Sequence, residues 1–200
     1  MEHEPMDEEN PPSLPDLVRE GLNVIFIGIN PSIFSASQGH YFARKTNRFW
    51  PAFSRSALSG TAREALGVPL LGPEHDRLLL DYGFGFTDAV KRPTARASDL
   101  NPVEFINGVA LLVEKLERYR PDVACFHGVT AYRAVHRALA SPATEANLGP
   151  QPLRIGGSRV FVVPNPSPAN AHSTPADQAL WYDRLAAFLT TRKVSDPKAI

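Results

Sequence analysis

The sequence predicts an α/β domain with a mostly parallel sheet between layers of helices. Three short, continuous apolar runs, at residues 23–28, 123–126 and 159–163, are typical of strands that are buried on both faces. Helical patterns lie between these runs, and strands that alternate with helices favour parallel pairing. A chain of 200 residues can bury about 70% of its unfolded surface, so one self-sufficient domain is expected.

Weaker local signals predict the elements between these strands. Residues 46–58 carry an apolar stripe at helical spacing, and residues 73–82 begin with a proline and acids before three leucines. Both segments are therefore expected to be helices. A weaker strand is expected at residues 84–87, and a further helix at residues 130–140.

Two helices carry N-terminal capping signals. Asn101 can cap the first of them, with Pro102 in the first turn and Glu104 three residues after the cap. Thr174 begins the last helix with the same order of proline and acid. Glu104 is therefore expected to be a capping residue and not an acid catalyst.

Charge divides the chain into a head and a body. Residues 1–20 hold seven acids and one base, a net charge of −6, and the rest of the chain holds 14 acids and 20 bases, a net charge of +6. We expect residues 1–20 to be a mostly disordered acidic tail, residues 21–192 to form the domain, and residues 193–200 to fray. On charge alone, a scatter of surface charge is favoured over a basic face for a polyanion.

Composition excludes several classes of protein. A single cysteine, Cys125, rules out a disulfide framework and any site with four thiolate ligands. No run of about 18 apolar residues is present, so no transmembrane helix is expected. The acidic N-terminus lacks the apolar core of a signal peptide. A soluble cytoplasmic protein is expected, with Cys125 and His127 as structural residues.

Ligands of open α/β sheets bind beyond the carboxyl ends of the strands, so residues 28–48, 87–99 and 164–173 are the candidate loops. The first begins with Gly28-Ile29-Asn30-Pro31, which is neither a dinucleotide fingerprint nor a P-loop. Asn30 follows the strand directly, and its amide can donate and accept hydrogen bonds. A plain turn residue that bonds its own backbone is the alternative.

Aromatic and basic residues alternate farther along the first loop. Tyr41 and Phe42 precede the expected helix, whereas Phe49 and Trp50 belong to its core face. The bases in this stretch are Arg44, Lys45 and Arg48. This mixture suits stacking on a nucleobase with positive charge near phosphates. Three prolines make residues 164–173 a stiff loop that can contact phosphate or enter a groove, although a structural turn is equally compatible.

Together these loops resemble the mismatch-specific uracil/thymine-DNA glycosylase branch of the uracil-DNA glycosylase superfamily. The resemblance covers roughly residues 21 to 190, and the order and spacing of its motifs carry it. In chain order the motifs are Gly28–Pro31, Ser35–Ala36, Gly39–Ala43, Asn47–Trp50, Arg92–Thr94 and Asn165–Ser167.

The resemblance implies a repair enzyme that removes uracil, and often thymine or damaged pyrimidines, from mispairs with guanine in double-stranded DNA. It implies a single three-layer domain with a sheet of about four strands, no metal or other cofactor, and activity at the nucleoid. We expect a monomer, because a DNA-facing groove needs no partner subunit.

The resemblance also assigns roles to residues of this chain. Asn30 would position the attacking water and Phe42 would stack on the flipped base. The chemistry itself calls for preorganised amide donors at the oxygen of the leaving pyrimidine, and the backbone N–H groups near Ile29 and Phe42 are candidates. Ser35 and Asn165 are also expected to contact the base. The residues expected to contact DNA are Arg44, Lys45, Ser167, Pro168, Ala169, Asn170, Ala171 and His172.

Two departures from the family pattern stand out. Ala169 and Ala171 occupy positions where the family often has an apolar wedge and an arginine, and Pro168 replaces a glycine. We therefore expect relaxed selectivity for the opposite base. Asp88 follows the weak strand, where the family does not usually keep a carboxylate. It is either a helix cap or a second catalytic group that activates water or stabilises sugar cation charge.

Two other functions fit the same residues. A non-catalytic protein that binds uracil or mispairs could use this scaffold without releasing a base. An unrelated α/β hydrolase could act on free nucleosides or nucleotides. The near-neutral net charge favours the hydrolase, whereas the aromatic and basic stretch at residues 41–50 favours DNA.

Overall fold

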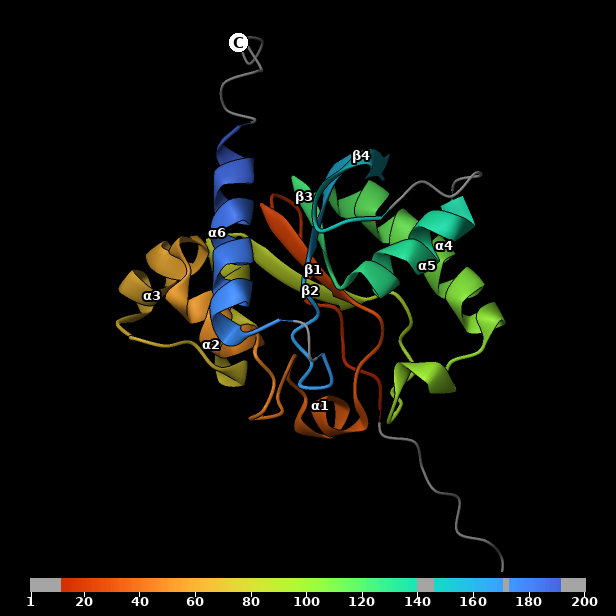
Figure 1. Ribbon diagram of the computed structural model, residues 1–200, viewed down its shortest axis with the longest axis horizontal. Coiled ribbons are helices and arrows are strands. Elements are labelled where there is room, and N and C mark those ends of the chain that lie inside the picture. Colours follow the sequence, from red (N-terminus) through yellow and green to blue (C-terminus); the bar gives the residue numbers. More distant parts are fainter. Residues whose placement is uncertain (1–11, 140–145, 171–172, 192–200) are drawn as a thin grey trace, which may run out of the picture.

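The computed structural model describes residues 12–139, 146–170 and 173–191, and these form a three-layer α/β domain (Figure 1). The central sheet has five strands in the order β2-β1-β3-β5-β4. Four strands are parallel, and β4 joins the edge antiparallel to β5. The strands are β1 (Val24–Gly28), β2 (Phe84–Asp88), β3 (Val123–His127), β4 (Gly149–Ile155) and β5 (Ser158–Val163).

Alternating side chains of the strands feed two separate cores. On one face, Phe26 and Phe86 pack with the helices α2 (Phe49–Arg55) and α6 (Pro175–Thr190). On the other, Ile25 packs with α4 (Pro102–Tyr119) and α5 (Val129–Leu139). Burial on both faces explains why β1, β3 and β5 are continuous apolar runs in the sequence.

Two further short α-helices are present in the described residues. The helix α3 (Gly60–Leu66) lies on the same side of the sheet as α2 and α6, and α1 (Ile33–Gln38) lies near the carboxyl ends of the strands (Figure 1). Among the described residues, no helix is long and apolar enough to cross a membrane.

The α/β fold class is confirmed, but the sheet has five strands where about four were expected. The strand that was not expected is β4, which is buried only at its two ends and includes the exposed Pro150 and Pro152. An edge strand tolerates prolines and need not be apolar, so β4 carries no strong strand signal. A tight turn joins it to β5 through Gly156 and Gly157, both with positive φ.

The helix expected over residues 73–82 is also wrong. This segment forms two 3-10 helices, Pro73–His75 and Leu78–Tyr82. Asp76 lies between them and turns its fully buried carboxylate inward, where it accepts a hydrogen bond from the Tyr41 N–H.

The expectation that residues 1–20 are mostly disordered is wrong for residues 12–20. Leu14 and Leu17 are buried, and Leu17 pairs with Phe86 through two backbone hydrogen bonds of 2.8 and 2.9 Å. The segment therefore extends the sheet beyond β2. The many acids of residues 1–20 are typical of a tail, and the two leucines that are buried here form no recognisable pattern in the sequence. Residues 1–11 and the expected fraying end at 193–200 lie outside the described residues.

This packing predicts that Leu17→Ala destabilises the protein. Removing a buried leucine side chain leaves a cavity, and we expect a loss of about 2–3 kcal/mol in the free energy of unfolding. Urea denaturation measures this loss. Leu70→Ala is the control, because Leu70 is 56% exposed and its truncation should cost less than about 0.5 kcal/mol. Equal, small effects of both substitutions would contradict the anchoring of residues 12–20.

Candidate active site

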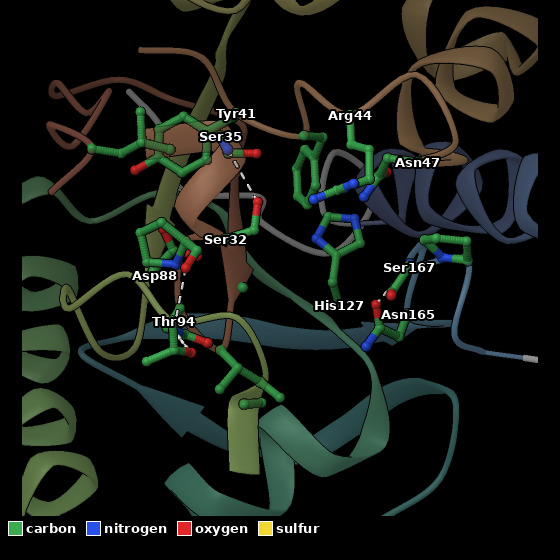
Figure 2. Close-up of a pocket in the computed structure, with 18 of the residues that line it drawn as sticks. Ser32, Ser35, Tyr41, Arg44, Asn47, Asp88, Thr94, His127, Asn165 and Ser167 are labelled. Carbon is green, nitrogen blue, oxygen red and sulfur yellow. Dashed lines mark hydrogen bonds between the residues drawn. The ribbon is translucent and has the colours of Figure 1, made fainter. Parts of the chain in front are cut away.

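A cavity of about 490 Å³ opens beyond the carboxyl ends of β1, β2 and β3. Figure 2 shows Asp88 and Thr94 on one side of this cavity, and His127, Arg44 and Asn165 across from them. Nine of the residues singled out from the sequence line it: Ile29, Asn30, Ser35, Phe42, Arg44, Asp88, Asn165, Ser167 and Pro168.

The pairing of β1 with β2 continues into the loops and brings two of these residues together. Gly28 pairs with Asp88 at the end of the parallel ladder. Beyond it the Val90 N–H donates to the Ile29 carbonyl at 2.8 Å, and Ser32 forms an isolated bridge with Thr94. The loops that carry Asn30 and Asp88 therefore run side by side, although 58 positions separate these residues in the sequence.

The amide of Asn30 is held in a fixed orientation. Its Nδ2 donates to the Arg92 carbonyl at 3.0 Å and to Thr94 Oγ1 at 2.7 Å, while Thr94 Oγ1 itself donates to the Arg96 carbonyl. A carbonyl oxygen only accepts, so the amide nitrogen must face this side and the amide oxygen the other. Asn30 Oδ1 makes no hydrogen bond within the described residues, and it can accept one from water.

Asp88 is a buried carboxyl group with spare hydrogen-bonding capacity. Its side chain ends β2 and is 6% exposed, and Oδ2 has no partner among the described residues. Burial raises the pKa of Asp88 to about 7, and Asp16 adds to this rise while Lys91 and Lys115 oppose it. No helix begins at Asp88, so its interpretation as a helix cap is wrong.

Gly28 leaves the room that this carboxyl group occupies. A Cβ atom at position 28 would overlap Asp88 Oδ1. The two residues are register partners on adjacent strands, so a side chain at position 28 would force the Asp88 carboxyl group out of the place it occupies. Gly28, which ends β1, therefore has a steric role in the site.

Phe42 forms an aromatic wall of the cavity in a strained backbone conformation. Its φ is +54°, a region that costs a non-glycine residue about 1–3 kcal/mol. Its ring stacks on Phe49 with centroids 4.4 Å apart and meets the His127 ring edge-on at 5.1 Å. The Phe42 N–H makes no hydrogen bond within the described residues.

Neighbouring hydrogen bonds hold Phe42 in this conformation. The Tyr41 N–H donates to Asp76 at 3.0 Å, Trp50 Nε1 donates to the Tyr41 carbonyl at 3.0 Å, and the Ala43 N–H donates to Ser35 Oγ at 3.2 Å. Tyr41 itself is 3% exposed and belongs to the core. Its expected place outside the core is therefore wrong, because it anchors the loop from within.

Arg48, one of the bases of the aromatic and basic stretch, holds the proline-rich loop against the start of α2. Arg48 Nη1 donates to the carbonyls of Asn170 and Ser173, at 2.7 and 2.8 Å. The Arg48 N–H also donates to the Pro166 carbonyl. Asn165 Oδ1 accepts from the Ser167 N–H and forms a turn. Arg48 therefore shapes the loop from its protein side.

The remaining DNA-contact candidates lie in different places. Ala169 and Asn170 line a second cavity of about 660 Å³, which shares His127 and Asn165 with the first. Lys45 is exposed and lines neither cavity. Ala171 and His172 lie outside the described residues.

His127 is a site residue for which the sequence predicted only a structural role. Its Nε2 lies 3.0 Å from the Tyr182 hydroxyl, and Nδ1 has no partner among the described residues. Burial lowers the pKa of His127 to about 3, so the ring is neutral near pH 7. Its position at the carboxyl end of β3 was the available signal. Within the described part of the chain, no group of three or more histidine, cysteine, aspartate or glutamate residues could hold a metal ion.

Comparison with known proteins identifies related sequences and folds. The model of a family described as the uracil DNA glycosylase superfamily matches residues 15–186. A solution NMR structure of a Methanosarcina acetivorans protein, provisionally assigned as a uracil DNA glycosylase, is 19% identical. The match covers 91% of this chain and 98% of that protein, with a TM-score of 0.53. At this identity, the structural likeness shows a shared fold.

The contact between Gly28 and Asp88 gives a prediction. Gly28→Ala should displace the Asp88 carboxyl group and lower the free energy of unfolding by about 1–3 kcal/mol, because the added methyl group overpacks the buried space that this carboxyl group fills. Urea denaturation measures this change. Gly60→Ala is the matched control, since its Cβ would meet nothing within 4 Å. If Gly28→Ala is as stable as Gly60→Ala, the steric role of Gly28 is wrong.

Proposed function

The chain belongs to the uracil DNA glycosylase superfamily, and we propose that it hydrolyses the N-glycosidic bond of uracil in double-stranded DNA as a member of the mismatch-specific branch. The single observation that carries this proposal is the shared cavity of Asn30, Asp88 and Phe42. An oriented amide, a buried carboxyl group and an aromatic wall are the groups that water activation and base stacking require. The product would be an abasic site, the starting point of base excision repair.

The substrate base would enter the cavity from outside the DNA stack. A base within the duplex is out of reach, and extruding it costs a few kcal/mol, least where the base is mispaired. Phe42 is half-buried, with Phe49 stacked against it, so its ring can support an extruded pyrimidine. Ile29, Ser35 and Asn165 line the same space and would contact the base edge.

Bond cleavage would separate charge between the base and the sugar. As the bond from C1′ to the base nitrogen breaks, its electron pair leaves with uracil and positive charge develops on the sugar. The free Phe42 N–H is suited to donate to a uracil oxygen as negative charge grows there. Water adds to C1′, with its lone pair forming the new bond.

Asn30 and Asp88 would have different roles toward this water, the first orienting it and the second accepting its proton. Asn30 Oδ1 accepts a hydrogen bond from it and so orients it, but a neutral amide is a poor base. Ionised Asp88 takes the proton that the water loses. A carboxyl group with a pKa of about 7 suits this step, because an effective general base has a pKa near the working pH.

DNA would be held at the rim of the cavity. Ser167 and Pro168 lie on the lining, and Arg44 contributes positive charge there, with Lys45 exposed beside it in sequence. Ala169 offers only a methyl group where the family often has a larger wedge. A small side chain fills the space of an extruded base poorly, so opposite-base selectivity is expected to be relaxed.

The proposal predicts alkali-dependent strand breaks at uracil under single-turnover conditions. Excess protein would meet labelled duplexes that contain U·G, U·A or T·G pairs, and single-stranded uracil, with EDTA present. We expect cleavage of U·G and U·A duplexes at comparable rates. Asn30→Ala and Asp88→Asn should each slow uracil release by about 100-fold or more, because each removes a group that acts on the water.

Matched controls separate chemistry from folding. Asp81→Asn makes the same carboxyl-to-amide change at a side chain that is 78% exposed, and Asn107→Ala removes an exposed helix amide. Both should retain wild-type rates. Duplex binding without base release would instead support a uracil or mispair sensor. Release from free deoxyuridine, with no dependence on duplex DNA, would support a nucleoside hydrolase.

The role of Asp88 also predicts a pH dependence. Since the ionised carboxylate accepts the proton, the single-turnover rate should rise with pH, with a midpoint at about 7, and level off above it. Rates measured from pH 5 to pH 9 test this. The residual rate of Asp88→Asn should lack this rise. A wild-type rate that is constant across this range would exclude Asp88 as the general base.

A further inference from the structure

The segment before β1 contributes a carboxylate to a partly buried ionic cluster at the β2 edge of the sheet. The backbone pairing of Leu17 with Phe86 fixes Asp16 beside β2. Asp16 Oδ1 accepts from Thr87 Oγ1 at 2.6 Å and from Lys91 Nζ at 2.8 Å. Asp16 Oδ2 lies 2.5 Å from Lys115 Nζ. One carboxylate thus contacts two ammonium groups that come from different parts of the fold.

Both lysines act on Asp88 through their charge, and each makes a hydrogen bond to a neighbour of Asp88. Lys115 Nζ donates to Thr87 Oγ1 at 2.7 Å, and Thr87 precedes Asp88 on β2. Lys91 follows Asp88 by three residues, and its Nζ donates at 3.4 Å to the hydroxyl of Tyr41, which lines the same cavity as Asp88. Among the described residues, every ion pair of these two lysines is made with Asp16, and none with Asp88.

We propose that Asp16 is a positioning residue for Asp88: by holding the ammonium groups of Lys91 and Lys115, it keeps them from pairing with the Asp88 carboxyl group, which stays free to take a proton. This inference rests on the proposed function, in which Asp88 is the general base. It also gives a role to a segment that acidic composition had marked as a tail. The same segment places Leu14 on the cavity wall.

The charged groups around Asp88 determine whether a given substitution should raise or lower the pH at which Asp88 ionises. The charged or titratable groups near it are Asp16 before β1, Lys91 after β2, Lys115 on α4, Tyr41 before α2, and His127 and Arg44 on the cavity wall. Tyr41 and His127 are neutral near pH 7, because burial raises the pKa of the phenol and lowers that of the imidazole. The two lysines and Asp16 therefore dominate the balance.

Replacing Asp16 or Lys115 should move the ionisation of Asp88 in opposite directions. Asp16→Asn removes a negative charge and frees two ammonium groups, so Asp88 should ionise at lower pH. Lys115→Met removes a positive charge at similar size, so Asp88 should ionise at higher pH. Each shift is expected to be about one pH unit, since a nearby charge typically changes a pKa by one unit or more.

Carbon-13 NMR titration of the aspartate carboxyl groups in the full-length, DNA-free protein is the deciding measurement. Asp88→Asn assigns the Asp88 signal, and thermal unfolding shows that each variant is folded. We expect the midpoint to fall in Asp16→Asn, to rise in Lys115→Met and to stay unchanged in Asp81→Asn. If Asp16→Asn does not fold, the rise in Lys115→Met still tests the balance of charge.

The rate of uracil release is measured over the same pH range as the second readout. Its midpoint should follow the NMR midpoint in each variant. NMR midpoints that stay fixed, or that move in the same direction in both variants, overturn the role of Asp16, because a general loosening of the fold would not give opposite shifts. Failure of wild-type protein to release uracil would overturn the proposed function alone, since the NMR titration needs no activity.

Discussion

The site depends on the parallel pairing of β1 with β2. Their register sets Gly28 opposite Asp88, and the pairing continues through the following loops to the bridge between Ser32 and Thr94. An amide at Asn30 and a carboxyl group at Asp88 therefore reach one cavity from strands that are distant in the sequence. The absence of a Cβ at position 28 leaves space for the carboxyl group. Sheet geometry and one glycine thus give the site two of its polar groups.

The aromatic core supports Phe42, which is the third group of the site after Asn30 and Asp88. Phe49 stacks on Phe42 and packs edge-on against Phe26 in the sheet, so the cavity wall continues the core. A positive φ at Phe42 persists because buried Asp76 and Ser35 hold the residues on either side of it. Under the proposed function, rigid support of this kind would keep the stacking ring in place before a base arrives, so less ordering would be needed on binding.

Sequence predicted the parts of the fold that depend on local patterns. Buried parallel strands and capped helices have such patterns, whereas the edge strand at residues 149–155 and the segment at residues 12–20 do not, because their stability comes from distant partners. The resemblance to a family pointed to Asn30, and position after a strand pointed to Asp88. No local signal showed that Asp16 contacts lysines 75 and 99 positions away, since that contact exists only once the sheet has formed.

The central claim is that Asn30 and ionised Asp88 face C1′ of an extruded nucleotide. Fluorescence anisotropy at pH 8 with two abasic-site duplexes tests it most directly, one with a cationic pyrrolidine in place of the sugar and the other with neutral tetrahydrofuran. The account predicts that wild-type protein binds the cationic duplex at least about tenfold more tightly, a difference of about 1.4 kcal/mol, and that Asp88→Asn loses most of this preference. Equal affinity of the wild-type protein for the two duplexes would contradict the account.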